Sequence, residues 1–248
     1  MSGHSKWSTI KRKKGVKDAK RSKIWARIAR DVMVAARDGG GDAGMNPRLA
    51  LSIEKAKSEN MPKDNIERAI KKGTGEIEGA DYVEMTYEGY ASGGIAVYVD
   101  ALTDNTNRTV ADVRSIFSKA GGSLGQTGSV AFLFSRKGVF EVPAAGINES
   151  ELFELVADAG AQDLVLEGDH FVVTCEVEDF GSVQTALESA NIETEDATLQ
   201  RIPLTTTSLD VDAATSVTKL IEKLEDHQDV QTVSTNLEFD EALLEALS

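Results

Sequence analysis

The chain of 248 residues contains little of what most metal and thiol sites require. It has one cysteine, Cys175, and three histidines, His4, His170 and His227, which lie far apart. A structural zinc site needs several Cys or His side chains at short, regular spacing, so the sequence argues against one. A single cysteine cannot form an internal disulfide, which suits a reducing compartment. Because Cys175 stands within an apolar stretch, we expect a buried thiol and not a nucleophile.

Long apolar runs are also missing. No stretch approaches the roughly 20 apolar residues that cross a membrane, and no apolar run follows the basic start as in a signal peptide. We therefore expect a cytoplasmic protein. The glycine-rich run 121–128 lacks the Gly-Lys-Ser/Thr ending of a phosphate loop and leads into a predicted strand, so we interpret it as a flexible loop. No pair of carboxylates has a spacing that indicates acid–base catalysis, and we expect neither enzymatic activity nor a cofactor.

Positive charge is scarce after residue 72 and concentrated before it. Residues 1–72 hold 19 Lys and Arg against 8 Asp and Glu, a net charge of +11, whereas residues 73–248 hold 8 against 33, a net charge of −25. The overall charge of −14 hides this asymmetry. A strongly basic segment beside an acidic remainder points to nucleic acid or another polyanion as partner.

The hydrophobic pattern divides the chain into a helical part and a part of mixed α/β character. Apolar residues recur every three to four positions in about 18–38, in a segment restarting at Asn46-Pro47, and in 60–73, which predicts three short helices. From Tyr82 the period becomes two, as in strands. Further strands are predicted at 130–134, 205–209 and 233–239.

The order of these elements predicts an α+β protein with an N-terminal three-helix domain followed by two ferredoxin-like (split βαβ) domains, one inserted in the other. We expect a basic helical domain at residues 1–79, a discontinuous α/β domain at 80–134 plus 204–248, and an inserted acidic α/β domain at 135–203. The inserted part holds 15 acids against 3 bases, so it is expected to face away from phosphates.

The candidate binding residues lie in the first 30 positions, which hold 11 bases and one acid. Such a density can neutralise phosphates and release counterions whatever the base sequence. Trp7 could stack on an unpaired base or, as an alternative of equal weight, fold back on the helices as a hydrophobic anchor. The predicted nucleic-acid-binding set is Lys6, Trp7, Lys11, Arg12, Lys13, Lys14, Lys17, Lys20, Arg21, Lys23, Arg27 and Arg30.

Several multi-residue runs resemble those of the YebC/PmpR family, which includes mitochondrial translational activators of cytochrome c oxidase. The runs are Ser2-Gly-His-Ser-Lys-Trp7, Lys13-Lys14 with Asp18-Ala-Lys-Arg21, Asn46-Pro-Arg-Leu49, Asn60–Gly73, Tyr87-Glu-Gly-Tyr90, Leu102–Thr109 and Gly128-Ser-Val-Ala-Phe132. The resemblance spans essentially the whole chain. It implies three domains, the second interrupted by the third, and a cytoplasmic regulator of gene expression, described as a probable transcriptional regulator that binds DNA.

Three hypotheses remain open on the sequence. The first is a transcriptional regulator that binds DNA through the helical part. The second, also implied by the resemblance, is a translation factor that contacts ribosomal RNA at the ribosome and relieves stalling. The third is a protein-interaction scaffold whose basic segment binds an acidic protein. Neither a membrane nor a small-molecule substrate is expected as partner.

Overall fold

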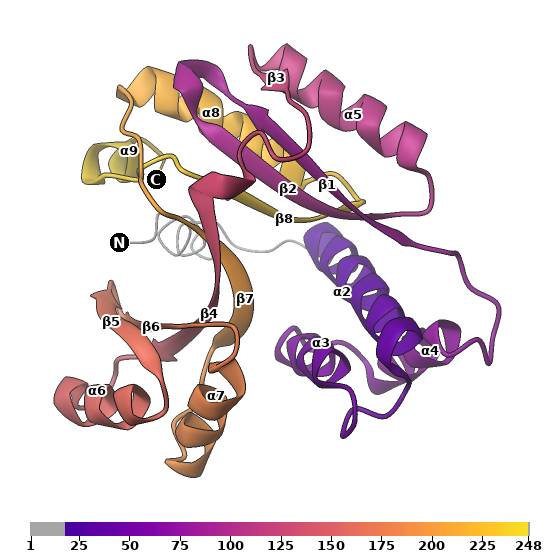
Figure 1. The fold of residues 1–248 in the computed structure, drawn as a ribbon, viewed down its shortest axis with the longest axis vertical. Helices are drawn as coiled ribbons and strands as arrows, with labels where there is room; N and C mark the ends of the chain where they lie inside the picture. Colours follow the sequence, from indigo (N-terminus) through magenta and orange to yellow (C-terminus); the bar gives the residue numbers. More distant parts are fainter. Residues whose placement is uncertain (1–17, 248) are drawn as a thin grey trace.

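The computed structural model describes residues 18–247 (Figure 1). Its N-terminal part is formed by α2 (Asp18–Gly39), α3 (Pro47–Ser58) and α4 (Lys63–Gly73), here called the helical module. Asn46 joins the first two helices: its Oδ1 accepts from Leu49 N at 3.1 Å as the N-cap of α3, while its Nδ2 donates to Ala35 O at 2.8 Å. This buried amide replaces backbone partners that helix ends lack.

The core of the helical module is small and aliphatic, as the helical periodicity predicted. Val32, Ala35 and Leu49 are fully or almost fully buried, with Ile66 and Ala69 of α4 packed against them. Gly73 ends α4 beside the backbone of α2: a Cβ at this position would lie 2.2 Å from Met33 O, so only glycine allows this approach.

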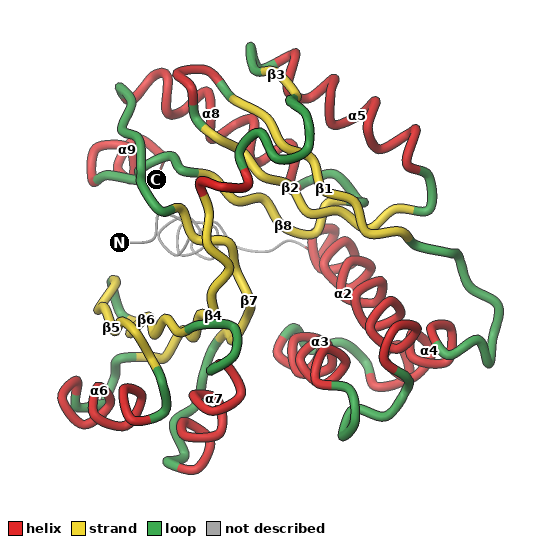
Figure 2. Tube along the Cα trace, in the orientation of Figure 1, coloured by secondary structure: helices red, strands yellow, loops and turns green. Residues whose placement is uncertain are grey.

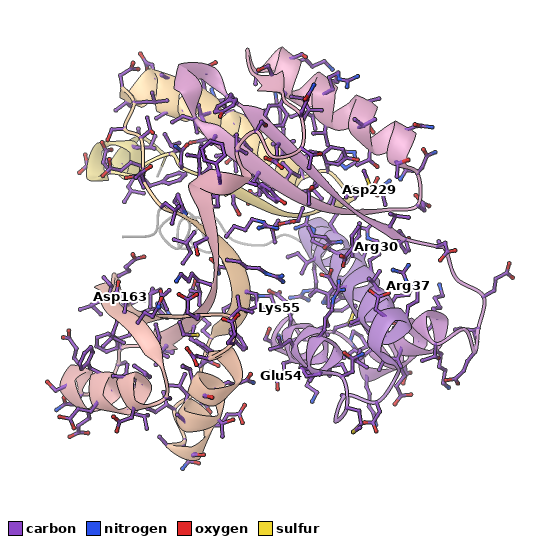
Figure 3. All side chains as sticks on the ribbon, in the orientation of Figure 1. Arg30, Arg37, Glu54, Lys55, Asp163 and Asp229 are labelled. Carbon is purple, nitrogen blue, oxygen red and sulfur yellow. The ribbon has the colours of Figure 1, made fainter. Side chains whose placement is uncertain are left out.

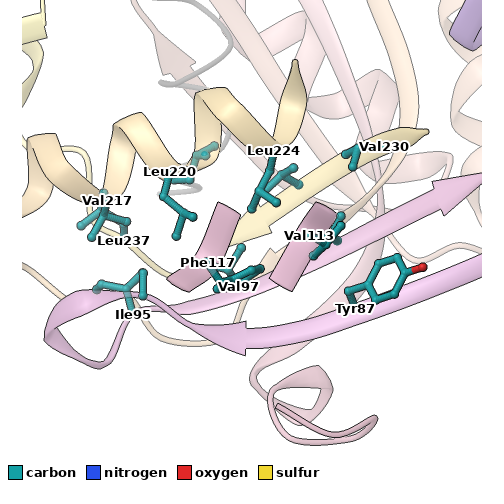
Figure 4. Packing of buried hydrophobic residues seen from close by; sticks show 14 of the residues in the cluster. Tyr87, Ile95, Val97, Val113, Phe117, Val217, Leu220, Leu224, Val230 and Leu237 are labelled. Carbon is teal, nitrogen blue, oxygen red and sulfur yellow. The ribbon is translucent and has the colours of Figure 1, made fainter. Parts of the chain in front are cut away.

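The first sheet has the strand order β3-β1-β2-β8, and all neighbours are antiparallel. Its strands are β1 (Val83–Tyr90), β2 (Ala96–Thr103), β3 (Ser123–Leu124) and β8 (Val230–Thr235). The helices α5 (Thr106–Lys119) and α8 (Val211–Glu225) cover one face together, as Figure 2 shows. Phe117 from α5 and Leu220 from α8 meet Val97 of the sheet in one hydrophobic core (Figure 4). The short helix α9 (Glu241–Leu247) follows and packs on α8.

The second sheet has the order β5-β6-β4-β7, which is the order in which a split βαβ unit pairs its strands. Its strands are β4 (Phe134–Pro143), β5 (Ala161–Glu167), β6 (His170–Cys175) and β7 (Asp196–Pro203). The helices α6 (Glu149–Asp158) and α7 (Phe180–Ser189) close its core, in which the rings of Phe140 and Phe180 stack 4.5 Å apart.

A two-stranded ribbon connects the two sheets. The strands β4 and β7 pair from Phe134↔Pro203 to Glu141↔Asp196 and run from one sheet to the other (Figure 1). The second sheet is therefore inserted between β3 and α8 of the first. The predicted α+β class, with three helices followed by two four-stranded antiparallel sheets and their helices, is confirmed.

The first sheet departs in detail from the prediction. Its two central strands, β1 and β2, form a hairpin, so its strand order differs from that of the second sheet. The predicted strand at 130–134 is wrong, because residues Ala131–Leu133 form a 3-10 turn and β4 begins at Phe134. The predicted strand at 205–209 reduces to a single bridge, Thr207↔Leu237, and the predicted strand at 233–239 is β8, which ends at Thr235.

Candidate nucleic-acid interface

Two arginines in the first half of α2 point into the protein. Arg27 donates through Nη2 to Glu225 O at 2.6 Å, and Arg30 donates to Gln228 O. Both carbonyls lie at or just after the C-terminal end of α8, where backbone acceptors lack helical partners and the helix dipole is negative. Burial lowers the pKa of Arg27, against the nearby negative charge of Glu225. The two guanidinium groups thus attach the helical module to the first sheet.

Asp229 is the centre of this attachment (Figure 3). Its side chain is 1% exposed, and it accepts from Arg30 at 3.4 Å, Arg108 at 2.8 Å and the hydroxyl of Thr109 at 2.8 Å. Burial alone would raise the pKa of Asp229, but the hydrogen bonds from Arg108 and Thr109 outweigh it and lower the pKa below its ordinary value. The carboxylate is therefore ionised and joins α2, α5 and β8.

Other cations of the helical module are also paired within the protein. Arg37 lies near Asp38 and donates to Tyr82 O at 2.5 Å, at the start of the first sheet. Arg48 of α3 pairs with Glu84, and Lys55 lies 2.6 Å from Asp196 of β7. These contacts hold the helical module against both sheets, so these side chains stabilise the folded structure.

A second group of cations on the module is turned outward. Among the acidic side chains that the structure describes, none lies at ion-pair distance from these cations, and all of them are exposed except Lys72, which is half-buried. They come from the start of α2, the end of α3 and from α4: Arg21, Lys23, Lys57, Arg68, Lys71 and Lys72. Five of the six stand on α2 and α4, which pack side by side, and the group is here called the outer basic surface.

The predicted binding residues separate into three sets. Lys6, Trp7, Lys11, Arg12, Lys13, Lys14 and Lys17 lie outside the described residues, and Lys20 belongs to α2 without a described side chain. Arg21 and Lys23 are exposed on the outer basic surface. Arg27 donates to Glu225 O, and Arg30 donates to Gln228 O and pairs with Asp229, so both guanidinium groups are engaged within the fold.

Sequence reasoning missed the cations of α4. Arg68, Lys71 and Lys72 alternate with buried Ile66 and Ala69 on an amphipathic helix, a pattern visible in the sequence.

A mixed-charge cavity lies where the helical module meets both sheets. It has a volume of about 490 Å³ and contains Asp31 of α2 together with Arg48, Asp100 and Arg201. Burial raises the pKa of Asp31 to about 7, although Arg48 and Arg27 act to lower it. Acids and bases alternate in this cavity, so it is not a uniformly positive site for an anion.

The glycine-rich run 121–128, predicted to be a loop, contains the short strand β3, and a carboxylate binds the amide at its C-terminal end. Glu88 is buried and accepts backbone N–H groups from Gly128, Val130 and Ala131 at 2.7–2.8 Å. These are the donors that a phosphate would need, and Glu88 already uses them. The loop therefore offers no anion site at these amides.

The described part of the chain contains no arrangement typical of metal or thiol chemistry. Cys175 is fully buried, and burial with nearby Asp179 and Glu176 raises the pKa of its thiol to about 11. Among residues 18–247, no group of three His, Cys, Asp or Glu side chains is placed to hold a metal ion. None of the helices in this range has the length and apolar character to cross a membrane.

Comparison with known proteins agrees with this architecture. Residues 5–76 match the model of the TACO1/YebC protein N-terminal domain, and residues 82–237 match that of the TACO1/YebC second and third domain. A probable transcriptional regulatory protein of Rubrobacter xylanophilus is 54% identical, with 98% of each chain covered. One of Treponema denticola is 50% identical, with 97% of this chain and 98% of the relative covered.

A solved structure shares the fold as well. The crystal structure of a conserved hypothetical protein from Aquifex aeolicus is 44% identical and superposes with a TM-score of 0.84, covering 90% of this chain and 93% of the other. Sequence and fold thus agree over nearly the full length, and the resemblance noted in the sequence is confirmed. The chain belongs to the TACO1/YebC family.

Proposed function

We propose that this protein is a non-enzymatic nucleic-acid-binding regulator of gene expression, with DNA as its target, and that it binds through its basic N-terminal segment and the outer basic surface. The observation that supports this best is the separation of the cations on the helical module. One group is used within the fold, and the other has no internal acidic partner in the described structure. The relatives' name, probable transcriptional regulatory protein, supports the same proposal.

Phosphate contacts explain how such a surface acts. Each cation that neutralises a phosphate releases a condensed counterion, so binding is favoured entropically and weakens as salt rises. The sheets carry most of the acidic charge and are repelled by the same phosphates. The charge distribution therefore orients the protein with its helical module towards the nucleic acid.

The test replaces Lys11, Arg12, Lys13 and Lys14 with alanine in the full chain. Affinity for duplex DNA is measured at several salt concentrations, and the same is done with a ribosomal RNA fragment. Loss of four phosphate contacts is expected to reduce the log–log salt slope by about 3–4 on duplex DNA. The matched control replaces four exposed cations of α5 and α8 with alanine, namely Arg114, Lys119, Lys219 and Lys223, and should bind like the unmodified protein.

The outcomes separate the alternatives. Undiminished binding by the first variant would contradict the proposal. A clear preference for ribosomal RNA, with co-sedimentation with ribosomes, would replace the DNA target with the ribosome. Absence of binding to either nucleic acid, together with capture of an acidic protein, would favour an interaction scaffold.

A further inference from the structure

A groove runs between α2 and α4 on the outer side of the helical module. It has a volume of about 310 Å³ and is formed where small side chains, Ala26 and Ala29 of α2 and Ala69 of α4, face one another. Small residues bring the two helices together without filling the space between them. The volume lies at the lower end of the range of about 300–1,000 Å³ for ligand pockets, so a single planar group fits better than an extended surface.

The groove has apolar walls. Trp25, Met33 and Met61 line it, and Met61 is buried. The indole of Trp25 donates its only N–H to Glu59 O at 2.9 Å. Because this donor is engaged, Trp25 offers the groove only its aromatic ring. Aromatic rings and thioethers are suitable neighbours for a planar π-system.

The rim of the groove is polar and positively charged. Asn65, Arg68 and Lys72 come from successive turns of α4 and line the groove on one side. Among the side chains that the structure describes, the amide of Asn65 has no hydrogen-bond partner, and the two cations have no carboxylate within 4.0 Å. An amide can pair with donors and acceptors on the edge of a base, and two cations one turn apart can contact neighbouring phosphates.

We infer that this groove holds one unpaired nucleotide of a single-stranded nucleic acid, with the base against Trp25 and the phosphates at Arg68 and Lys72. This inference deepens the proposed function and depends on it. A paired base cannot enter, because its edge and both faces are occupied in a duplex. The charge of the rim favours an anionic occupant over the chain's own basic segment around Trp7, which carries Lys6 and Lys11–Lys14.

The experiment uses the full chain with Trp7→Phe, so that Trp25 is the sole tryptophan. The probes are a 12-nucleotide single-stranded DNA and a duplex of the same sequence, and both affinity and tryptophan fluorescence are measured. We expect the single strand to quench Trp25 and the duplex to leave it unchanged. Ala29→Leu, which fills the groove, should weaken single-strand binding about tenfold, since it removes the stacking of one base, and leave duplex affinity unchanged.

A second variant keeps the test decisive if Ala29→Leu disturbs the fold. Arg68→Ala removes a cation from the rim, and Lys71→Ala removes one from the same helix at a position that does not line the groove. Arg68→Ala should weaken the single strand more than the duplex, whereas Lys71→Ala should weaken both equally. Circular dichroism of each variant checks that the helices are intact.

Three results would overturn the inference. The first is equal loss of single-strand and duplex affinity in Ala29→Leu and Arg68→Ala. The second is a Trp25 signal that the single strand does not change. The third is tighter binding of both probes by Ala29→Leu, which would indicate that the chain's own N-terminal segment occupies the groove. If the unmodified protein binds neither probe, the proposed function itself fails.

Discussion

Arg21 and Lys23 stand on the same helix as Arg27 and Arg30, yet the two pairs have different roles. The first pair is exposed on the outer basic surface. The second pair contacts carbonyls around the C-terminal end of α8, and Arg30 is 9% exposed. One to two helical turns therefore separate a cation that can meet a phosphate from one that holds two parts of the protein together. Charge density in a sequence is an upper limit on the charge that a partner can contact.

Two acids near Arg27 and Arg30 also differ from each other, in the direction of their pKa shifts. Asp229 is surrounded by donors, so its pKa is lowered although it is buried. Asp31 is half-buried near Arg27 and Arg30, but desolvation dominates there and raises its pKa to about 7. The number of hydrogen bonds that reach the carboxylate decides between these outcomes. The attachment of α2 thus combines one stabilising acid with one that is costly when ionised.

The largest loss of stability is expected from Asp229→Ala. Removing this carboxylate leaves Arg30, Arg108 and the hydroxyl of Thr109 without their shared acceptor. Breaking a buried ion pair from one side costs about 3–5 kcal/mol, which corresponds to a fall in Tm on the order of 10 °C. Thermal unfolding followed by circular dichroism measures it.

Asp226→Ala is the matched control, because Asp226 lies three residues earlier and is exposed. It should change Tm by less than about 2 °C. If both variants lost the same stability, Asp229 would not be the centre of the attachment. The lowered pKa of Asp229 also means that its contribution is present above pH 4 and is lost as the pH falls through its folded-state pKa.

Asp31→Asn is expected to raise the stability of the protein, by less than Asp229→Ala lowers it. Since the pKa of Asp31 is raised to about 7, the folded protein keeps a proton that the unfolded chain releases above pH 4. Stability therefore falls as the pH rises from about 4 to 7. The amide mimics the protonated carboxyl, and solvent screening reduces the effect at this half-buried position, so the variant should gain on the order of 1 kcal/mol at pH 8 and nothing at pH 4.

The measurement is Tm across this pH range, where the gain at pH 8 corresponds to about 2–4 °C. Asp226→Asn serves as comparison and should show no gain that depends on pH. A gain for Asp31→Asn that is equal at pH 4 and pH 8 would contradict the raised pKa.

The sequence predicted those features that depend on neighbouring residues. The stripe with Ile28, Val32 and Ala35 predicted α2 because a helix buries every third or fourth residue, and Asn46-Pro47 predicted the start of α3. The family resemblance predicted the fold of the whole chain. The shared fold with a solved structure that is 44% identical agrees with that prediction.

Features that depend on distant residues were not predictable in this way. The run 130–134 has the composition of a strand, but Glu88, about 40 residues earlier, engages the N–H groups of Val130 and Ala131 and leaves Phe132 66% exposed. Arg30 resembled a surface cation because its partner Asp229 lies 199 positions away. Local periodicity contains no information on such pairs.

The smallest change in stability is expected when Arg21 and Lys23 are both replaced with alanine. Neither side chain has an ion-pair partner in the described structure, so Tm should stay within about 2 °C. If each contacts a phosphate, the salt slope of duplex binding falls by about 2.

The double variant Arg27→Ala and Arg30→Ala should do the reverse, lowering Tm while leaving the slope unchanged. Thermal unfolding measures Tm of both variants, and salt titrations measure the slope of their duplex binding. A change of slope in the second variant would mean that the attachment of α2 opens on binding, because only release from α8 and Asp229 would let those guanidinium groups reach a phosphate.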